Sequence, residues 1–206
     1  MAPFPAVRLQ VRQAPFTGTG IDCFGSVHVL CKRSNVKRWN CLFTCLTVRA
    51  VHIEIPHSLD VNSFINALRR FIARRGKPKI VYSDNGTNFA IGGKELRATI
   101  ESWKSENVTD ETVRLGIDWH FSPPSAPHFG GIWELLVQSA KRALYAVLKE
   151  RVTTDGTLLT VNTEVEAFLN ARPLTHISAD PNDGEPLTPK PFSTWTCYST
   201  LFSWPV

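Results

Sequence analysis

Three acidic residues in short polar motifs are the strongest indication of chemistry in this sequence. Asp22 lies in GIDCFG, Asp84 in SDNGTNF and Glu134 in GGIWE, and each carboxylate ends or interrupts an apolar stretch. A charge in such surroundings needs a partner, and a divalent metal satisfies several acids together. Two metal ions held by a few carboxylates can cut and rejoin phosphodiesters. The acids therefore predict a phosphodiester-processing site with two Mg²⁺ ions, for which Mn²⁺ is a substitute.

Each acid also has an ordinary explanation when it is considered alone. Asp22 fits a turn between Gly20 and Gly25. The sequence Asp-Asn-Gly that begins at Asp84 is typical of turns. Glu134 fits the first turn of a helix, where the helix dipole favours a negative charge. The prediction of a metal site therefore depends on the three acids converging at one edge of a sheet.

Composition places the chain among globular proteins. Of 206 residues, 43% are hydrophobic and 20% are charged, which suits one well-buried core. Lys and Arg number 23 against 18 Asp and Glu, so the net charge is +5 and the pI is about 9.1. This basic excess fits a polyanionic partner without proving one. No apolar run approaches the length of about 18 residues that a membrane helix needs, so we expect no membrane contact.

The five cysteines do not predict a disulfide framework. Their number is odd and no secretory signal is recognisable, so we expect free thiols in a reducing compartment. Cys41, Cys45 and His52 leave open half a zinc site. The preferred interpretation is that the two cysteines lie on one face of a strand and pack as small apolar side chains.

Hydrophobic periodicity predicts alternating strands and helices after a lead-in segment at residues 1–14. We expect strands, rich in β-branched and aromatic residues, over about 18–30, 39–46, 50–55, 79–82 and 116–121. We expect helices from a cap at Ser58 or Asp60 to Gly76, and over about 94–104, 132–149 and 161–171. Short connections make the first three strands antiparallel neighbours. The pattern predicts an α/β fold, in which helices flank a mixed sheet.

Seven segments, taken in order, resemble the integrase catalytic core of long-terminal-repeat retroelements, most closely the BEL/Pao group. They are GIDCFG (20–25), KRWNCLFTC (37–45), RAVHIE (49–54), RRFIARRG (69–76), SDNGTNF (83–89), PHFGGIWE (127–134) and RPLT (172–175). The resemblance covers about residues 5–190 and lapses near the C-terminus. It implies a core over 15–175 and an irregular tail over 176–206.

The resemblance implies an RNase H-like fold with a five-stranded mixed sheet and an Asp-Asp-Glu strand-transfer mechanism. Asp22, Asp84 and Glu134 match the family's catalytic, metal-binding positions. In this family water first trims the element's 3′ ends, and the freed hydroxyl then attacks a phosphate of target DNA. The expected partners are therefore element ends and target DNA, with further copies of the chain in a homo-oligomer. A DNA substrate implies action in the nucleus.

Residues that follow Glu134 on the same helix are candidates for DNA contact. Gln138 and Lys141 lie four and seven positions later, on the same helical face, and Arg142 is adjacent. Their side chains are placed to contact phosphates beside the metal ions. A solvated helix face is the equally weighted alternative.

Two further candidates and one loop come from the segments around the acids. Asn88 either orients a DNA end or caps the next helix, and His128 is a weaker candidate for DNA contact. The resemblance implies that residues 122–131 form the mobile active-site loop, in which Gly130 and Gly131 allow closure over DNA.

An arginine-rich helix and the flanks of the core leave alternatives open. One cluster of cations can line a DNA track, but the outer face of an amphipathic helix is the preferred interpretation: Arg69, Arg70, Arg74, Arg75, Lys77 and Lys79. The family's zinc module has no counterpart in this sequence, which leaves open a catalytically silent, nucleic-acid-binding fragment or domesticated remnant. A nuclease of the RNase H type is a third hypothesis, and the integrase-like segments argue against it.

Overall fold

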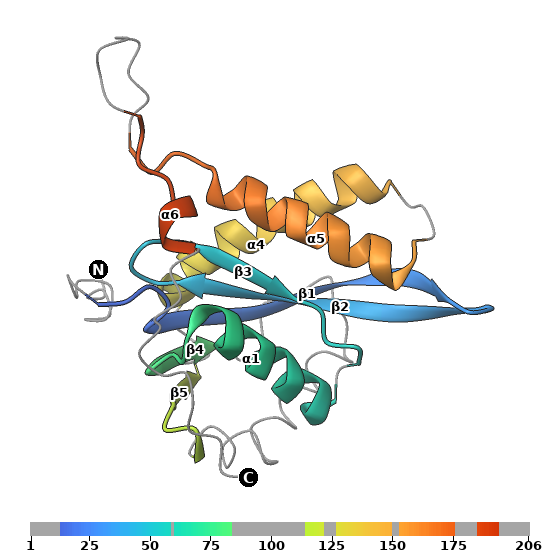
Figure 1. Ribbon diagram of the computed structural model, residues 1–206, viewed down its shortest axis with the longest axis horizontal. Coiled ribbons are helices and arrows are strands. Elements are labelled where there is room, and N and C mark those ends of the chain that lie inside the picture. The colour runs from blue at the N-terminus through green and yellow to red at the C-terminus, as the bar shows by residue number, and fades with distance from the viewer. Residues whose placement is uncertain are drawn as a thin grey trace.

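The computed structural model describes residues 13–58, 60–83, 114–121, 127–149, 153–175 and 185–193. Its strands are β1 (Gly18–Cys31), β2 (Ser34–Cys45), β3 (Val51–Glu54), β4 (Ile80–Ser83) and β5 (Asp118–Phe121). Its helices are α1 (Val61–Arg75), α4 (Pro127–Leu148), α5 (Asp155–Asn170) and the single turn α6 (Lys190–Ser193). Helix α1 covers one face of the sheet, and α4 and α5 cover the other (Figure 1). No described helix is long and apolar enough to cross a membrane.

The five strands form one mixed sheet in the order β3-β2-β1-β4-β5. Strands β1, β2 and β3 are antiparallel neighbours, whereas β4 and β5 run parallel to β1. Both the antiparallel start and the α/β class with a mixed five-stranded sheet are confirmed. The register places Ile21 of β1 opposite Ser83, the last residue of β4. In the sequence, Asp22 directly follows Ile21, and Asp84 directly follows Ser83.

Several boundaries differ from the predicted ones. Strand β2 begins at Ser34 instead of residue 39, because the turn contains only Lys32 and Arg33. Helix α5 begins at Asp155 instead of residue 161, since the Thr154 side chain accepts a hydrogen bond from the backbone N–H of Thr157. The single turn α6 interrupts the tail that was expected to be irregular. The helix predicted at 94–104 lies outside the described residues.

Helix α1 begins and ends as predicted. Asp60 is its N-cap and accepts a hydrogen bond from the backbone N–H of Ser63 at 2.6 Å. Gly76 is its C-cap, with φ of 90°, a conformation that favours glycine. The apolar stripe of the helix buries Phe71, whose ring stacks on Phe43 of β2 with 4.3 Å between the centroids. This contact fixes α1 over the middle of the sheet.

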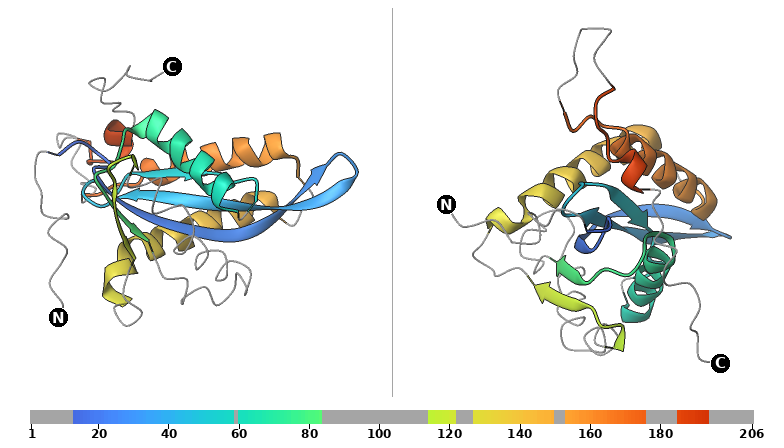
Figure 2. Two further views of the ribbon diagram at one scale, coloured as in Figure 1. Left: turned by 90° about the horizontal axis from the view of Figure 1, so that it is seen from below. Right: turned by 60° about the vertical axis from the view of Figure 1, so that its left-hand side comes forward.

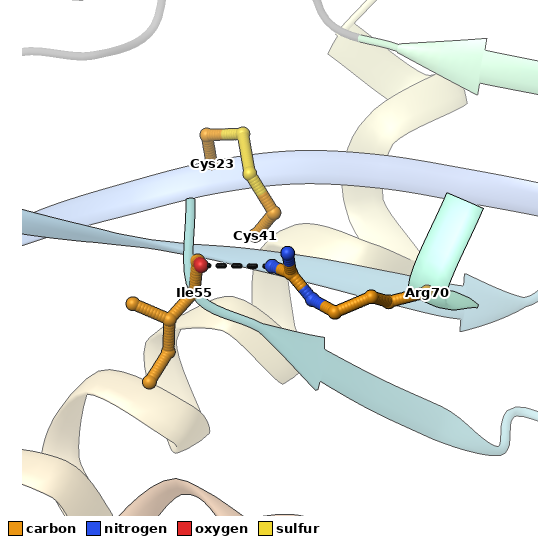
Figure 3. Close-up of a disulfide and its surroundings, with 4 residues drawn as sticks. All are labelled: Cys23, Cys41, Ile55 and Arg70. Carbon is orange, nitrogen blue, oxygen red and sulfur yellow. Dashed lines mark hydrogen bonds between the residues drawn. A yellow bond between two sulfur atoms is a disulfide. The ribbon is translucent and has the colours of Figure 1, made fainter. Parts of the chain in front are cut away.

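The cysteine prediction is wrong for one pair. Cys23 and Cys41 lie directly opposite each other on β1 and β2 and form a disulfide (Figure 3). The sequence did not indicate this pairing because it depends on strand register. Cys45 is free and buried, and its Sγ accepts a hydrogen bond from the backbone N–H of Phe16. With Cys41 bonded to Cys23, the alternative of a zinc site is wrong as well.

An irregularity in β1 changes which side chains face α4 and α5. The register with β2 shifts between Phe24 and Val27, and Gly25 has φ of 66°. Phe24, Val27 and Val29 therefore all pack into the cluster beneath α4 and α5, although strict alternation would separate Phe24 from the two valines. Beyond this bulge, alternation puts His28 and Leu30 on the opposite, exposed side of the strand.

Helix α5 covers the outer edge of β3 with polar side chains. The side-chain amide of Asn170 accepts a hydrogen bond from the Val51 N–H at 2.8 Å and donates one to the Val51 carbonyl at 2.9 Å. Glu166 accepts a hydrogen bond from the Ile53 N–H at 2.9 Å. Backbone groups of an edge strand that would otherwise remain open are thereby satisfied by a helix.

A buried network of charges joins α1, β3 and α5. His52 lies 3.0 Å from a carboxylate oxygen of Glu54 and 3.0 Å from one of Glu166. Arg70 and Arg74 of α1 contact Glu54 at 2.6 and 2.7 Å. Arg70 also donates a hydrogen bond to the carbonyl of Ile55, as Figure 3 shows.

The third arginine of α1 in this network is Arg75, which contacts Glu166. Arg70, Arg74 and Arg75 each form an ion pair within the fold. These contacts fit neither a DNA track nor a fully solvated helix face. The network was not predicted, since Glu54 and Glu166 lie on elements distant from α1 in the sequence.

The network shifts the ionisation of its members. Burial by itself lowers the pKa of His52, but the hydrogen bonds with Glu166 and Glu54 outweigh burial and raise the pKa above its usual value. Burial by itself raises the pKa values of both glutamates, and their contacts with His52 and the arginines lower them below the usual range. The two carboxylates therefore favour protonation of His52 more in the folded protein than in the unfolded chain.

We expect the free energy of unfolding to decrease as the pH rises above about 6.5, the ordinary pKa of histidine. A raised pKa in the folded state stabilises the protein fully below the unfolded-state value, and this stabilisation is lost as the pH rises through the folded-state value. Each unit by which the pKa is raised corresponds to about 1.4 kcal/mol. The measurement is urea unfolding from pH 6 to pH 9, for the parent and for His52→Gln.

His57→Gln is the matched control, because His57 is exposed on the loop after β3. The control should retain the pH dependence of the parent, whereas His52→Gln should lose most of it and be less stable at pH 6. Identical slopes for all three proteins would show that His52 is not the titrating group.

Candidate active site

Asp22 lies near the middle of the sheet, on the face that α4 covers. It is one of the few buried charged residues, with 8% of its surface exposed. Gly20 and Phe24 precede and follow it on the same face of β1, and Leu42 is its partner on β2. The β1–β2 ladder holds Asp22 opposite Leu42, and the pairing of β1 with β4 extends to Ile21, the residue before it. The backbone that carries the carboxylate is therefore firmly placed.

Helix α4 runs along β1 in the same direction. A Cβ atom on Gly20 would lie 2.7 Å from the Trp133 ring, and the Nζ of Lys141 lies 5.9 Å from the centroid of the Phe24 ring. Trp133 and Lys141 are eight residues apart, or about 12 Å along a helix. Gly20 and Phe24 are four residues apart, or about 13 Å along a strand. Nearly equal lengths of α4 and β1 therefore separate the contact at Gly20 from the contact at Phe24. Asp22, midway between them on β1, lies beside the part of α4 between Trp133 and Lys141.

Glu134 comes from this same part of α4. It is half-buried and directly follows Trp133, whose side chain is buried against Gly20. One residue rotates a helix by about 100°, so Glu134 lies on the flank of the seam between α4 and β1. The structure thus places the first and third predicted acids on two elements that pack against each other.

Asp84, the second predicted acid, lies outside the described residues, as does Asn88. The residue before it, Ser83, is buried, and its Oγ accepts a hydrogen bond from the Trp119 indole at 2.9 Å. Ser83 lies opposite Ile21, the neighbour of Asp22. The carboxyl end of β4 therefore lies beside Asp22, which is the arrangement that the sequence predicts for convergence of the acids.

The candidate DNA-contact residues on α4 differ in exposure. Gln138 and Arg142 are exposed, and the Nε of Arg142 donates a hydrogen bond to the Gln138 carbonyl at 3.5 Å. Lys141 is half-buried, with its ammonium group near the Phe24 ring. All three are accessible, and their contact with DNA remains a prediction.

The predicted loop 122–131 is in part helical. Helix α4 begins at Pro127, so His128, Gly130 and Gly131 lie in its first turns and not in a loop. A proline is well suited to the first position of a helix, because its missing N–H would have no partner there. The loop prediction is thus wrong for 127–131, and residues 122–126 lie outside the described part. The predicted mobility of this region remains untested.

The sequence did not identify Trp133 as the residue that determines the position of α4. Its ring fills the space above Gly20, and Tyr82 of β4 packs against the same small cluster. Tyr82 in turn stacks on His120 of β5, with 5.2 Å between the ring centroids. The sequence held one signal for this contact. Gly20 lies two positions before Asp22 on a buried strand, so the two residues face the same side of the sheet, and a glycine there allows another element to approach closely.

The donor atoms at this site suit a hard divalent cation. The described acids contribute carboxylate oxygens, which Mg²⁺ prefers and which leave positions for water and phosphate oxygens. Among residues that the structure describes, no three His, Cys, Asp or Glu side chains gather as a metal site. That result is compatible with the prediction, because Asp84 is the third member and falls outside those residues. The site therefore fits Mg²⁺ in the chemistry of its donors.

The comparisons with known proteins identify the fold. No family model and no curated protein matches the sequence. A chain of the simian T-cell lymphotropic virus intasome in complex with PP2A regulatory subunit B56 gamma matches with a TM-score of 0.57 and 17% identity. That match covers 94% of this chain and 60% of the other, so this chain spans less than two thirds of the other's length.

A second solved structure is the HTLV-2 integrase catalytic core domain in complex with magnesium, in a dimeric form. It matches with a TM-score of 0.52 and 17% identity, over 87% of this chain and 97% of the other. At this identity the likeness shows the fold alone. The chain therefore has the RNase H-like fold of an integrase catalytic core, as predicted.

We expect Gly20→Ala to lower the free energy of unfolding by about 1–3 kcal/mol, because a Cβ atom 2.7 Å from the Trp133 ring overpacks the seam between β1 and α4. Urea unfolding measures the change. The control is Gly156→Ala on α5, where the nearest atom would lie 3.9 Å from the new Cβ. Alanine is favoured over glycine in a helix by up to about 1 kcal/mol, so the control should be neutral or stabilising. Equal effects of both variants would contradict the proposed packing role of Gly20.

Proposed function

We propose that this chain is the catalytic core of a DNA strand transferase of the integrase type. The observation that carries the proposal is the position of Asp22. A buried carboxylate lies on a central strand of an RNase H-like sheet, beside the carboxyl end of β4 and beneath the helix that carries Glu134. Asp84 directly follows that strand in the sequence. The seven integrase-like segments support assignment to the BEL/Pao group of retroelements.

Asp22, Asp84 and Glu134 are the residues that would hold Mg²⁺. The chemistry that the bound metal supplies is activation of an attacking oxygen and stabilisation of a leaving oxygen at phosphorus. The protein contributes position. Pairing with Leu42 of β2 holds the backbone of Asp22, one residue beyond the last pair of β1 with β4. The packing of Trp133 on Gly20 fixes the position of the helix that carries Glu134.

Side chains of α4 would orient the DNA. Lys141 and Arg142 carry positive charge about two turns of α4 after Glu134, where they can hold phosphates of the element's end in line with the attacking oxygen. Gln138 lies between them and Glu134 in the sequence and can contact sugar or phosphate. In this proposal the same site trims the 3′ end and then joins it to target DNA in the nucleus, in an assembly of several copies of the chain.

We expect Asp22→Asn, Asp84→Asn and Glu134→Gln each to reduce DNA joining at least about a hundredfold, since removal of one electrostatic contribution to a transition state commonly costs that much. The assay is strand transfer and disintegration by the purified chain on labelled branched DNA, in Mg²⁺ or Mn²⁺. The matched control is Glu164→Gln, which makes the same chemical change on the exposed face of α5 and should leave joining intact.

Two outcomes would contradict the enzymatic proposal. Product that persists in all three acid variants would place the activity elsewhere. A folded parent that binds DNA in a salt-sensitive manner, but yields no product with either metal, would favour the alternative of a silent, nucleic-acid-binding remnant.

A further inference from the structure

The hairpin of β1 and β2 extends well beyond the rest of the sheet. Strand β4 pairs only with the first residues of β1, Gly18–Ile21, and β3 pairs only with Cys41–Thr44 near the end of β2. The intervening residues 24–40 form a two-stranded ribbon, which projects past the neighbouring strands in both views (Figures 1 and 2). Residues 24–40 therefore add nothing to the pairing with β3 or β4.

Contacts along one side of the ribbon, as far as Leu30 just before the turn, hold it in place. The Leu30 N–H donates a hydrogen bond to the Thr153 carbonyl at 2.7 Å, and Val29 is fully buried. Arg38 binds both carboxylate oxygens of Asp155 at 2.8 and 3.1 Å, which ties β2 to the start of α5. One side of the ribbon is therefore anchored to the body of the protein.

The other side and the tip of the ribbon are exposed and basic. Residues 24–40 contain no Asp or Glu, and they contain Lys32, Arg33, Lys37 and Arg38. Arg38 is used in the ion pair with Asp155, whereas Lys32 and Arg33 form the exposed turn. A tip that carries two cations, with no acid nearby in its own sequence, is complementary to a polyanion.

The ribbon lies in line with the active site and with the basic side of α4. Helix α4 follows β1 from Gly20 beneath Trp133 to Phe24 beside Lys141, and the chain after it meets β1 again at Val29. Two further cations are exposed here, Arg142 on α4 and Lys149 directly after its last residue. Positive charge is thus distributed from Glu134 toward the tip.

The span from Asp22 to the tip of the ribbon is close to the length of one turn of duplex DNA. Asp22 and Lys32 are ten positions apart, which is at most about 33 Å along a strand. One helical turn of B-form DNA is about 34–36 Å. We consider a duplex whose end lies at Asp22 and whose axis runs along β1. After one helical turn, the phosphates of the same strand would again face the protein, close to the tip of the ribbon.

We propose that Lys32 and Arg33, at the tip of the β1–β2 ribbon, bind the phosphate backbone of duplex DNA about one helical turn from the phosphodiester at Asp22. This inference rests on the proposed function, because it takes the DNA end to lie at the three acids. The contact is with phosphates and so carries no base specificity. Its role is to align the element's DNA along α4.

The test is the salt dependence of DNA binding by the full chain, measured by fluorescence anisotropy with labelled duplexes of 20 and 6 base pairs. Loss of two phosphate contacts should lower the slope of log K against log salt by about 2 and weaken binding of the long duplex about tenfold. We expect these changes for Lys32→Gln combined with Arg33→Gln. The short duplex, which spans only about 20 Å, should bind the parent and this variant alike.

Two controls separate the ribbon from overall charge. Lys77→Gln combined with Lys79→Gln removes the same charge from exposed residues just before β4, at the opposite end of the sheet from the tip, and should leave the slope unchanged. Lys32→Arg combined with Arg33→Lys keeps both charges and should behave as the parent.

Each remaining outcome overturns a specific claim. An unchanged slope for the glutamine variant of the ribbon, or an equal loss in the Lys77 and Lys79 variant, would overturn the ribbon contact while leaving strand transfer by the parent untouched. A parent that binds neither duplex would overturn the proposed function together with this inference.

Discussion

The architecture of the candidate site depends on the absence of one side chain. Because Gly20 has no Cβ, the Trp133 ring can lie directly against the backbone of β1, and α4 approaches the sheet more closely than any larger residue would permit. That approach brings the helix that carries Glu134 over the strand that carries Asp22. The carboxylates can be near neighbours only because the surfaces beneath them fit at this point.

The β3 edge of the sheet is stabilised by a different kind of interaction. There the helices are joined to β3 by ion pairs and side-chain hydrogen bonds, with His52 at the centre of the charges. Such buried charges are stable only when every partner is present, so they specify the geometry of α1 and α5 more strictly than apolar contacts would. Close packing of Trp133 on Gly20 thus positions the helix that carries Glu134, and the polar network around His52 positions α1 and α5 on the sheet.

Local patterns in the sequence predicted much of this structure, and features that depend on distant residues were beyond them. Segments rich in β-branched and aromatic residues correctly identified the first strands, and the helical apolar stripe with the cap at Asp60 identified α1. The disulfide between Cys23 and Cys41 requires the register of two strands, which alternation alone does not determine. The start of α4 was misplaced because Gly130 and Gly131 weaken a helix, whereas the proline at its first position favours one.

The same reasoning explains which parts of the site could be predicted. Asp22 and Glu134 were recognisable because a charge within an apolar stretch is costly and therefore conspicuous. The contact of Trp133 with Gly20, by contrast, joins residues more than a hundred positions apart in the sequence, so no local pattern indicates it.

The amide of Asn170 has a consequence for how copies of this chain can associate. By imitating a peptide group along β3, it occupies the positions that an incoming strand from another molecule would use. Extension of the sheet across this edge, whether in an ordered complex or in an aggregate, would first have to displace the helix. Any assembly on this side of the molecule must therefore be built by helix surfaces, and the sheet remains a closed, finite structure there.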